Sequence, residues 1–248
     1  MRIGIIGAGH IGSTLAGLLV KLGHEVRIAN SRGPDTLRQV AGDTGAEPVL
    51  AQRASDGADL VVLSIQMDAI ADLSPSLFAE LAPGVPLVDT CNYYPRLRDR
   101  VIPEIERGIA ESRWVADRIG RPVTKAFNSI TFSSLADKHR PAGEPGRIAL
   151  PVAGDDQAAT ALVADLIDAI GFDPVDAGSL EESWRQQPGT PGYCTDLGSA
   201  RLQAALALAD RAAAPRRRDL FIEKMKEAFG RGGQPDLVEL SREVYCAP

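Results

Sequence analysis

Residues 2–23 read RIGIIGAGHIGSTLAGLLVKLG and decide the fold. Their first five residues form a short apolar run typical of a buried strand, and Gly7, Gly9 and Gly12 follow it directly. The apolar residues of the next segment recur at the spacing of one helical face: Ile11, Leu15, Leu18, Leu19 and Leu22. A strand, a glycine turn and a helix in this order predict the first βα unit of a dinucleotide-binding sheet.

Each glycine of this G-x-G-x-x-G motif has its own physical task. Gly7 permits the tight turn, Gly9 lets a pyrophosphate approach the backbone, and Gly12 lets the helix and the strand pack closely. The N-terminus of the helix then offers free N–H groups and a partial positive charge to the phosphates. The alternative is a turn that needs glycine only for its own geometry, and the flanking strand and helix argue against it.

The segment after the second predicted strand (residues 25–29) selects the nucleotide. NAD sites usually carry Asp or Glu there, whereas this chain has Asn30, Ser31 and Arg32. A carboxylate would repel a 2′-phosphate, but the Arg32 guanidinium can pair with it through two parallel hydrogen bonds, and Asn30 and Ser31 can add donors. We therefore predict NADPH rather than NADH as the cofactor. The alternative is that Arg32 is a solvated loop residue.

The remaining pattern alternates strands with helices over most of the chain. We predict strands at residues 47–50, 60–65, 86–90, 123–127, 147–153 and 172–177, and helices at 35–42, 96–119 and 159–170. This alternation predicts an α/β fold with a doubly wound, mostly parallel Rossmann sheet. Only helix-like segments follow, at 196–210, 216–229 and 235–245. We expect an NADP-binding Rossmann domain over residues 1–178 and a small helical C-terminal domain over 179–248 that completes the acceptor pocket.

The composition narrows the class of function. The 248 residues carry a formal net charge of −6, which argues against a nucleic-acid partner. Three cysteines without a C-x-x-C pair indicate neither a disulfide framework nor a structural zinc site, so we expect no metal and a reducing, cytoplasmic location. The sequence has no run of 18 uncharged apolar residues, so we expect no membrane span.

Three later strands end in small polar residues, at 64–66, 91–92 and 128–129. Ligands of open parallel sheets bind outside the carboxyl ends of the strands. The residues that we expect to line the ribose and the nicotinamide are therefore Ser64, Ile65, Gln66, Asn92 and Asn128. Strand ends are often polar without any ligand, so this alternative stays open for each of them.

Lys125 is the most informative candidate for the chemistry. It shares one face of a predicted strand with Val123 and Phe127, and a lysine on an apolar face either extends to solvent or has a charged partner. We predict Lys125, as substrate anchor or proton donor, and Asn128 as the catalytic residues. The three histidines lie in turns or loops, and the Tyr-x-x-x-Lys pair of short-chain dehydrogenases is absent. Hydride transfer needs mainly orientation and exclusion of water, since the cofactor supplies the chemistry.

Several segments together resemble one family. GIIGAGHIG, NSR, LVVLSI, VTKAFNSI, PVAGDD and GFDPVDAGSL look like the NADP oxidoreductases that use a deazaflavin, coenzyme F-420 (F420), over residues 1–185. The resemblance implies that hydride passes directly between NADP(H) and the deazaflavin. The residues that it places at the pyrophosphate are Gly7, Gly9, His10, Ile11 and Gly12. It also implies Ser31 and Arg32 at the 2′-phosphate, Ile65 and Gln66 beside the cofactor, and Ala126 to Ile130 at the nicotinamide and the acceptor.

The chain also departs from that family. Gln66 stands where a proline is expected, and residues 92–118 form an insertion. Trp184 and Arg185 follow GSL, and we predict that they contact the substrate. Residues 193–248 have no recognised counterpart, although their basic stretch at 211–231 is either a landing area for an anionic acceptor or a solvated helix face.

Two other functions stay open besides hydride transfer to a deazaflavin. The chain can be an NADPH-dependent reductase of a small imine, ketone or enone, or a module that binds NADPH without catalysis. The partner that we expect is a small-molecule acceptor. We also expect a homodimer, from the resemblance and from the apolar helix at 196–210.

Overall fold

The main sheet has six parallel strands. The computed structural model describes residues 1–78 and 81–246. The strands of this sheet are β1 (Arg2–Ile6), β2 (Glu25–Ala29), β3 (Glu47–Pro48), β4 (Leu60–Leu63), β5 (Leu87–Asp89) and β6 (Thr124–Lys125). They lie in the order β3-β2-β1-β4-β5-β6, and every neighbouring pair is parallel. The strand order reverses beside β1, which confirms the predicted doubly wound Rossmann sheet.

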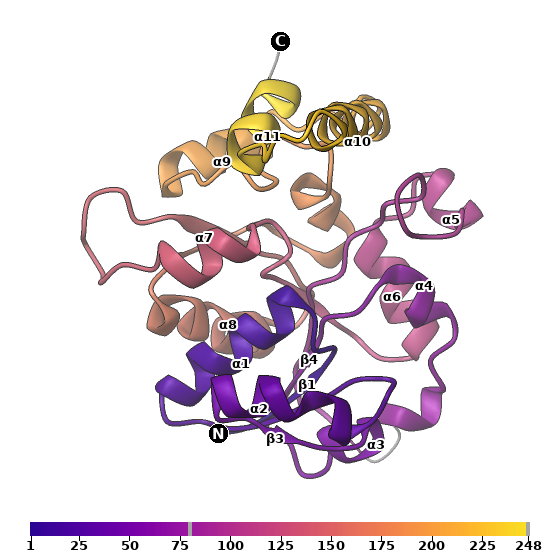
Figure 1. Cartoon of the computed structure of the whole chain (residues 1–248), viewed down its shortest axis with the longest axis vertical. Coiled ribbons are helices and arrows are strands. Elements are labelled where there is room, and N and C mark those ends of the chain that lie inside the picture. Colours follow the sequence, from indigo (N-terminus) through magenta and orange to yellow (C-terminus); the bar gives the residue numbers. More distant parts are fainter. Residues whose placement is uncertain (79–80, 247–248) are drawn as a thin grey trace.

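Helices cover both faces of this sheet (Figure 1). In chain order they are α1 (His10–Lys21), η1 (Pro34–Leu37), α2 (Arg38–Thr44), α3 (Ala51–Ala54), α4 (Met67–Ala71), η2 (Pro75–Phe78), α5 (Pro103–Glu106), α6 (Glu111–Ile119), α7 (Phe132–Asp137) and α8 (Gln157–Ile170). The 3-10 helix η1 and α2 together occupy the position of the helix predicted at 35–42.

Strand β4 shows how the two faces are divided. Leu60 and Val62 pack in the apolar cluster that includes residues of α1 and α8, whereas Val61 and Leu63 pack with residues of α4 and α6. This alternation follows from the two-residue period of a strand. Because both faces are buried, the strand reads in the sequence as an unbroken apolar run.

The strands predicted at 147–153 and 172–177 form a small sheet of their own. β7 (Ala149–Val152) and β8 (Asp173–Asp176) pair in parallel, with α8 connecting them. An antiparallel bridge joins this pair to β6, with the Lys125 N–H 2.8 Å from the Ala153 carbonyl and the Ala153 N–H 3.0 Å from the Lys125 carbonyl. The predicted mostly parallel sheet is thus divided into two connected pieces.

The long helix predicted over residues 96–119 is wrong in its first half. The N–H groups of Leu97, Arg98 and Asp99 all donate to the Tyr94 carbonyl, and the Asp99 carboxylate accepts from the Tyr94 N–H at 2.7 Å. These bonds close a compact loop in place of a helix. Gly108, with a φ of 100°, then separates the short α5 from α6.

Helices dominate the C-terminal part. They are η3 (Leu180–Gln186), α9 (Ser199–Ala207), α10 (Ala214–Gly230) and α11 (Leu237–Tyr245). α10 and α11 pack together over an apolar cluster that includes Tyr94, Tyr193 and Tyr245, and they lie at the end of the molecule opposite β3 (Figure 1). The Tyr94 hydroxyl donates to the Tyr193 hydroxyl at 2.8 Å, which anchors this part on the loop after β5. The boundary near residue 178 stays a prediction.

Within residues 1–78 and 81–246, no helix has both the length and the hydropathy needed to cross a bilayer.

Candidate nucleotide-binding site

The three glycines of the turn after β1 differ in what surrounds them. A Cβ on Gly7 would lie 2.0 Å from the Ser64 carbonyl oxygen, and the φ of Gly7 is +117°. A Cβ on Gly12 would lie 2.0 Å from the carbonyl oxygen of Gly7. Around Gly9, by contrast, no atom beyond its chain neighbours lies within 4 Å of the Cβ position. The fold itself therefore requires Gly7 and Gly12, whereas the open space at Gly9 fits the close approach of a bound molecule.

The N-terminus of α1 is free to bind an anion. Gly9 is its N-cap residue, and no side chain caps the helix. The N–H groups of the first turn and the helix dipole therefore face the space beside Gly9 without an internal partner, which is the arrangement that binds phosphate groups in other folds. His10 and Ile11 start this helix, and the His10 ring stacks on Phe132 of α7 with ring centroids 4.4 Å apart. The stacking fixes the position of the imidazole beside the turn.

The loop after β2 exposes the predicted 2′-phosphate residues. The Asn30 side chain accepts from the Arg32 N–H at 2.9 Å and donates to the Thr36 hydroxyl at 2.9 Å, so it shapes the loop. Ser31 and Arg32 are exposed, and the Arg32 guanidinium has no hydrogen-bond or ion-pair partner among the residues that the structure describes. Asp35, the nearest carboxylate in the sequence, pairs with Arg38 at 2.7 Å. This loop therefore presents an uncompensated cation.

The other predicted cofactor residues follow β4. Ser64 donates its N–H to the Ile6 carbonyl at 2.8 Å, which places it beside the glycine turn. Ser64 and Ile65 are half-buried, and Gln66 is exposed at the start of α4. All three lie at the carboxyl edge of the sheet, where the prediction put them.

Three amide side chains join the ends of β5 and β6 to η3. Asn128 donates to the side-chain oxygen of Asn92 at 3.1 Å, and Asn92 donates to the Asn128 carbonyl at 3.0 Å. The Gln186 amide donates to the Asn128 side-chain oxygen at 3.0 Å. Asn92 is half-buried, but Asn128 and Gln186 are buried. The structure thus brings the predicted residues Asn92 and Asn128 together, and Gln186 is a third member that the sequence did not indicate.

Ala126 and Phe127, which precede Asn128, are buried as well. Ala126 has no exposed surface. Phe127 has a φ of +58°, which is uncommon for a residue with a side chain and turns the backbone sharply before Asn128. Strained backbone of this kind clusters at functional sites.

Lys125 has a charged partner, the second of the two alternatives for a lysine on an apolar strand face. Its Nζ lies 3.2 Å from Oδ2 of Asp89, both side chains have no exposed surface, and Nζ also donates to the Cys91 carbonyl. Ser112 of α6 donates to the same Asp89 oxygen at 2.6 Å. Lys125 is thus enclosed in the structure, where it fixes the backbone beside Asn92. Asp89 and Ser112 were not predicted, although a carboxylate at the end of an apolar strand was visible as a signal.

Trp184 and Arg185 lie on η3 and directly precede Gln186. The Arg185 guanidinium lies 4.7 Å from the centroid of the Trp184 ring, and the Arg211 guanidinium lies 5.4 Å from it. Trp184 lines a cavity together with Glu111 and residues at the start of α10. No hydrogen bond or ring contact between described residues links Trp184 to Asn92 or Asn128, so a contact between Trp184 and the substrate stays a prediction.

Comparisons with known proteins agree with this geometry. Residues 2–93 match the family described as NADP oxidoreductase, coenzyme F420-dependent. The protein YjhV of Escherichia coli (strain K12) is 38% identical over 115 residues, which cover 44% of this chain and 81% of YjhV. The crystal structure of the hypothetical protein SMa0349 from Sinorhizobium meliloti is 33% identical, with a TM-score of 0.62 over 75% of this chain and 89% of that one.

The chain belongs to the F420-dependent NADP oxidoreductase family. A crystal structure from Arthrobacter sp. FB24, of a protein proposed to be an F420-dependent NADP reductase, shares the fold with a TM-score of 0.63, 23% identity and coverage of 92% of this chain and 94% of that one. Membership of this family makes the protein an NADP-dependent oxidoreductase. In this NADP oxidoreductase the matched residues include the glycine turn, Arg32, Gln66 and Asn92, whereas Lys125, Asn128 and Trp184 lie beyond them.

Proposed function

We propose that this NADP oxidoreductase transfers a hydride between NADP(H) and coenzyme F420 or a similar deazaflavin. The family description and the proposed activity of the Arthrobacter protein support this acceptor. The observation that best supports NADP(H) binding is the open space at Gly9, since nothing inside the fold requires glycine there. An uncapped helix N-terminus beside that space fits a pyrophosphate.

The residues of the chain divide the binding of the nucleotide among three places. The pyrophosphate lies against Gly9 and the first turn of α1, and Arg32 and Ser31 bind the 2′-phosphate. The nicotinamide lies toward Asn92 and Asn128, whose mutual hydrogen bonds hold both side chains in one orientation. Bound NADP(H) supplies the hydride at its nicotinamide ring. The protein supplies orientation, and the half-buried Ile65 beside the turn helps to exclude water.

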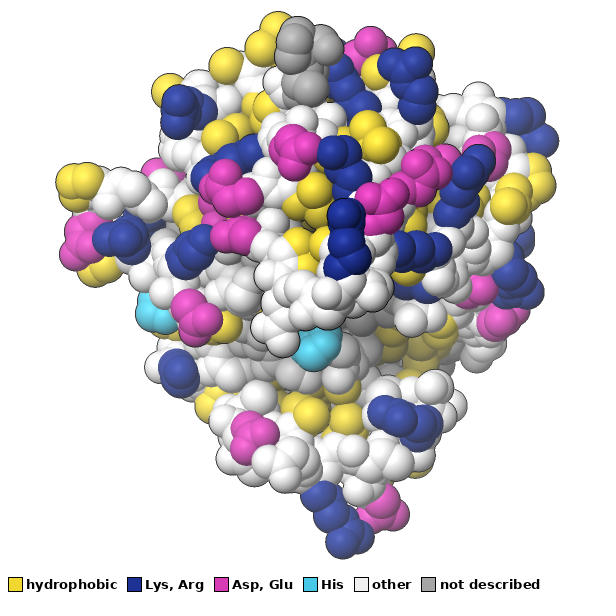
Figure 2. All heavy atoms as spheres, turned by 45° about the horizontal axis from the view of Figure 1, so that its top comes forward, with side chains coloured by type: hydrophobic (Ala, Val, Ile, Leu, Met, Phe, Trp, Pro, Cys, Tyr) yellow, Lys and Arg dark blue, Asp and Glu magenta, His cyan; other side chains and the backbone are white. Residues whose placement is uncertain are grey.

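The basic stretch at 211–231 is a weaker support for an anionic acceptor. Lys224 pairs with Glu243 at 2.6 Å and Arg231 with Glu227 at 3.1 Å. Figure 2 shows dark blue and magenta side chains intermixed over the C-terminal helices rather than a patch of one sign. We therefore propose that most of this stretch is a solvated, internally paired surface.

The test is direct hydride transfer from NADPH. Enzyme and oxidised F420 are mixed with NADPH deuterated at the transferable position, and the expected result is loss of the deazaflavin absorbance with deuterium on the reduced ring. The Gly9→Ala variant is the matched control and should be slow at the same NADPH concentration. Stable absorbance at saturating enzyme would reject the deazaflavin. Oxidation of NADPH by a small imine, ketone or enone would then assign the other reductase activity, and binding without oxidation by any acceptor would assign a non-catalytic nucleotide-binding protein.

A further inference from the structure

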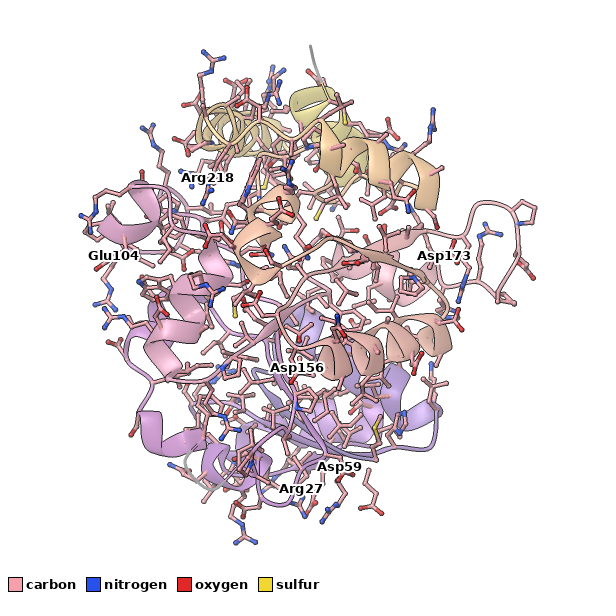
Figure 3. The ribbon with its side chains drawn as sticks, turned by 180° about the vertical axis from the view of Figure 1, so that it is seen from behind. Arg27, Asp59, Glu104, Asp156, Asp173 and Arg218 are labelled. Atoms are coloured by element: carbon pink, nitrogen blue, oxygen red, sulfur yellow. The ribbon has the colours of Figure 1, made fainter. Side chains whose placement is uncertain are left out.

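The cavity that Trp184 and Glu111 line lies away from the glycine turn. Its volume is about 300 Å³, and its walls come from α5, the start of α6, the end of η3 and the first turns of α10. Arg218 is one of its lining residues. Figure 3 shows Arg218 beneath α10, on the same side of the molecule as Glu104 of α5. The described residues that line it include none from the glycine turn or the Arg32 loop. The cavity is therefore distinct from the nucleotide site.

Positive charge predominates on the cavity wall. Arg107, Arg211 and Arg218 line it, against the carboxylates of Glu106 and Glu111. Arg211 is held by the Gly108 carbonyl and by Glu181, 3.4 Å away, and Arg218 by Asp219 at 3.2 Å. The exposed Arg107 guanidinium has no hydrogen-bond or ion-pair partner among the described residues. Each guanidinium has five N–H donors, so even the paired ones keep donors for a ligand.

Gln187 also lines the cavity and has an unused donor. Its Nε2 is buried and has no hydrogen-bond acceptor in the structure. A buried donor without a partner is unfavourable, so native structures rarely keep one that no ligand or water satisfies. A ligand acceptor that reaches Nε2 from the cavity would satisfy this donor.

Glu111 is the lining residue whose charge opposes an anion. Glu111 is only 3% exposed, and its Oε2 accepts one hydrogen bond, from the Tyr93 N–H at 3.2 Å. Burial raises the pKa of Glu111 to about 7, although Lys125 of β6 and Arg218 of α10 act in the opposite direction and Asp89 of β5 reinforces the rise. From α5, Glu106 also lines the cavity. Near neutral pH the protonated and ionised forms of the Glu111 carboxyl are thus about equally populated.

We propose that this cavity binds a small molecule through an acid group, a phosphate or a carboxylate held by Arg107, Arg211 and Gln187, and that Glu111 takes up a proton when the acid group binds. Neutral Glu111 no longer repels the anion and can donate a hydrogen bond to it. The proposal does not depend on the identity of the hydride acceptor.

The test uses Trp184 as the reporter, because it lines the cavity and Trp114 is the only other tryptophan in the sequence. The full chain with Trp114→Phe is titrated with inorganic phosphate and with succinate, and sodium chloride at equal ionic strength is the control. We expect a saturable change of Trp184 emission with at least one of the two anions. The anion that binds with the lower Kd identifies the acid group as phosphate or carboxylate. Gln187→Glu should abolish the response, and Arg107→Gln should weaken binding at least about fivefold. Arg216→Gln, which removes the same charge from an exposed site outside the cavity, should change it less than about twofold.

The proton uptake is tested with sulfate, whose charge does not change near neutral pH. Between pH 6 and pH 8 the affinity of the wild-type cavity for sulfate should fall about tenfold, because binding requires protonated Glu111. Glu111→Gln should bind sulfate with no such dependence. A response equal to that of sodium chloride, a response retained in Gln187→Glu, or a response only to an amine such as methylammonium would overturn the site. NADPH binding is measured separately on the same protein, so failure here leaves the nucleotide proposal intact.

Discussion

Asp89 and Lys125 form an ion pair with no exposed surface, Oδ2 to Nζ 3.2 Å apart. The other Asp89 oxygen accepts from the Cys91 N–H at 2.9 Å, and Lys125 donates to the Cys91 carbonyl. The pair therefore holds the backbone immediately before Asn92, whose side chain bonds to Asn128. A buried salt bridge contributes little net stability, but it fixes where these two strand ends lie.

Removal of one member of this pair should be strongly destabilising. Lys125→Met leaves the Asp89 carboxylate buried without its counterion, and we expect the free energy of unfolding in urea to fall by about 3–5 kcal/mol. Lys125→Met combined with Asp89→Asn should recover much of that loss. The matched control is Lys224→Met, because Lys224 pairs with Glu243 at 2.6 Å and both side chains are exposed to solvent, so its loss should cost about 1 kcal/mol or less. Equal losses for Lys125→Met and Lys224→Met would contradict the role given to the buried pair.

Gly7 and Gly9 should respond differently to alanine. The Cβ of Gly9→Ala would have free space, and the backbone of Gly9 is extended, so the variant's free energy of unfolding should stay within about 1 kcal/mol of the wild type. Its Kd for NADPH should rise at least about tenfold. Gly7→Ala should lose about 3 kcal/mol of stability, because its Cβ meets the Ser64 carbonyl at a positive φ. Thermal denaturation and calorimetric titration measure the two effects. An unchanged Kd for Gly9→Ala would remove the nucleotide from this turn.

Arg32 should discriminate between the two nucleotides. Charged hydrogen bonds contribute about 1.5–3 kcal/mol, so Arg32→Ala should raise the KM for NADPH about 10- to 150-fold and leave that for NADH within about twofold. Arg38→Ala is the control, since Arg38 is exposed and already paired with Asp35. Steady-state kinetics with both nucleotides measures the ratio, and equal effects of Arg32→Ala on NADPH and NADH would refute the assignment.

Glu111 should make the protein less stable as the pH rises. Its pKa is raised from 4.5 to about 7 in the folded chain by burial, so the folded state holds a proton that the unfolded state has released in this window. The contribution is fully present below pH 4.5 and is lost as the pH approaches 7, by about 3 kcal/mol. Urea unfolding at several pH values should show a flatter dependence for Glu111→Gln than for the wild type. Glu104→Gln, at an exposed position, should keep the wild-type slope.

Interactions between distant segments limited what the sequence could predict. Lys125 was visible as a lysine on an apolar strand, but Asp89 lies 36 residues earlier and became its partner only when β5 and β6 paired. Trp184 was predicted to contact the substrate. The sequence did not indicate that Glu111 lines the same cavity, because Glu111 was expected inside a long helix over residues 96–119. That helix failed because Asp99 and the Tyr94 carbonyl close a loop, a competition that helical periodicity does not register.

The sequence by itself determined the first βα unit and the glycine turn and predicted NADPH, because each of these depends on residues close together along the chain. The parallel sheet followed from the alternation of strands and helices. Only the tertiary structure decided the burial of Asp89 and Lys125, the amide contacts of Asn92 with Asn128, and the cavity beside Glu111. Burial and charge environment depend on which segments fold against each other, and no local pattern encodes them.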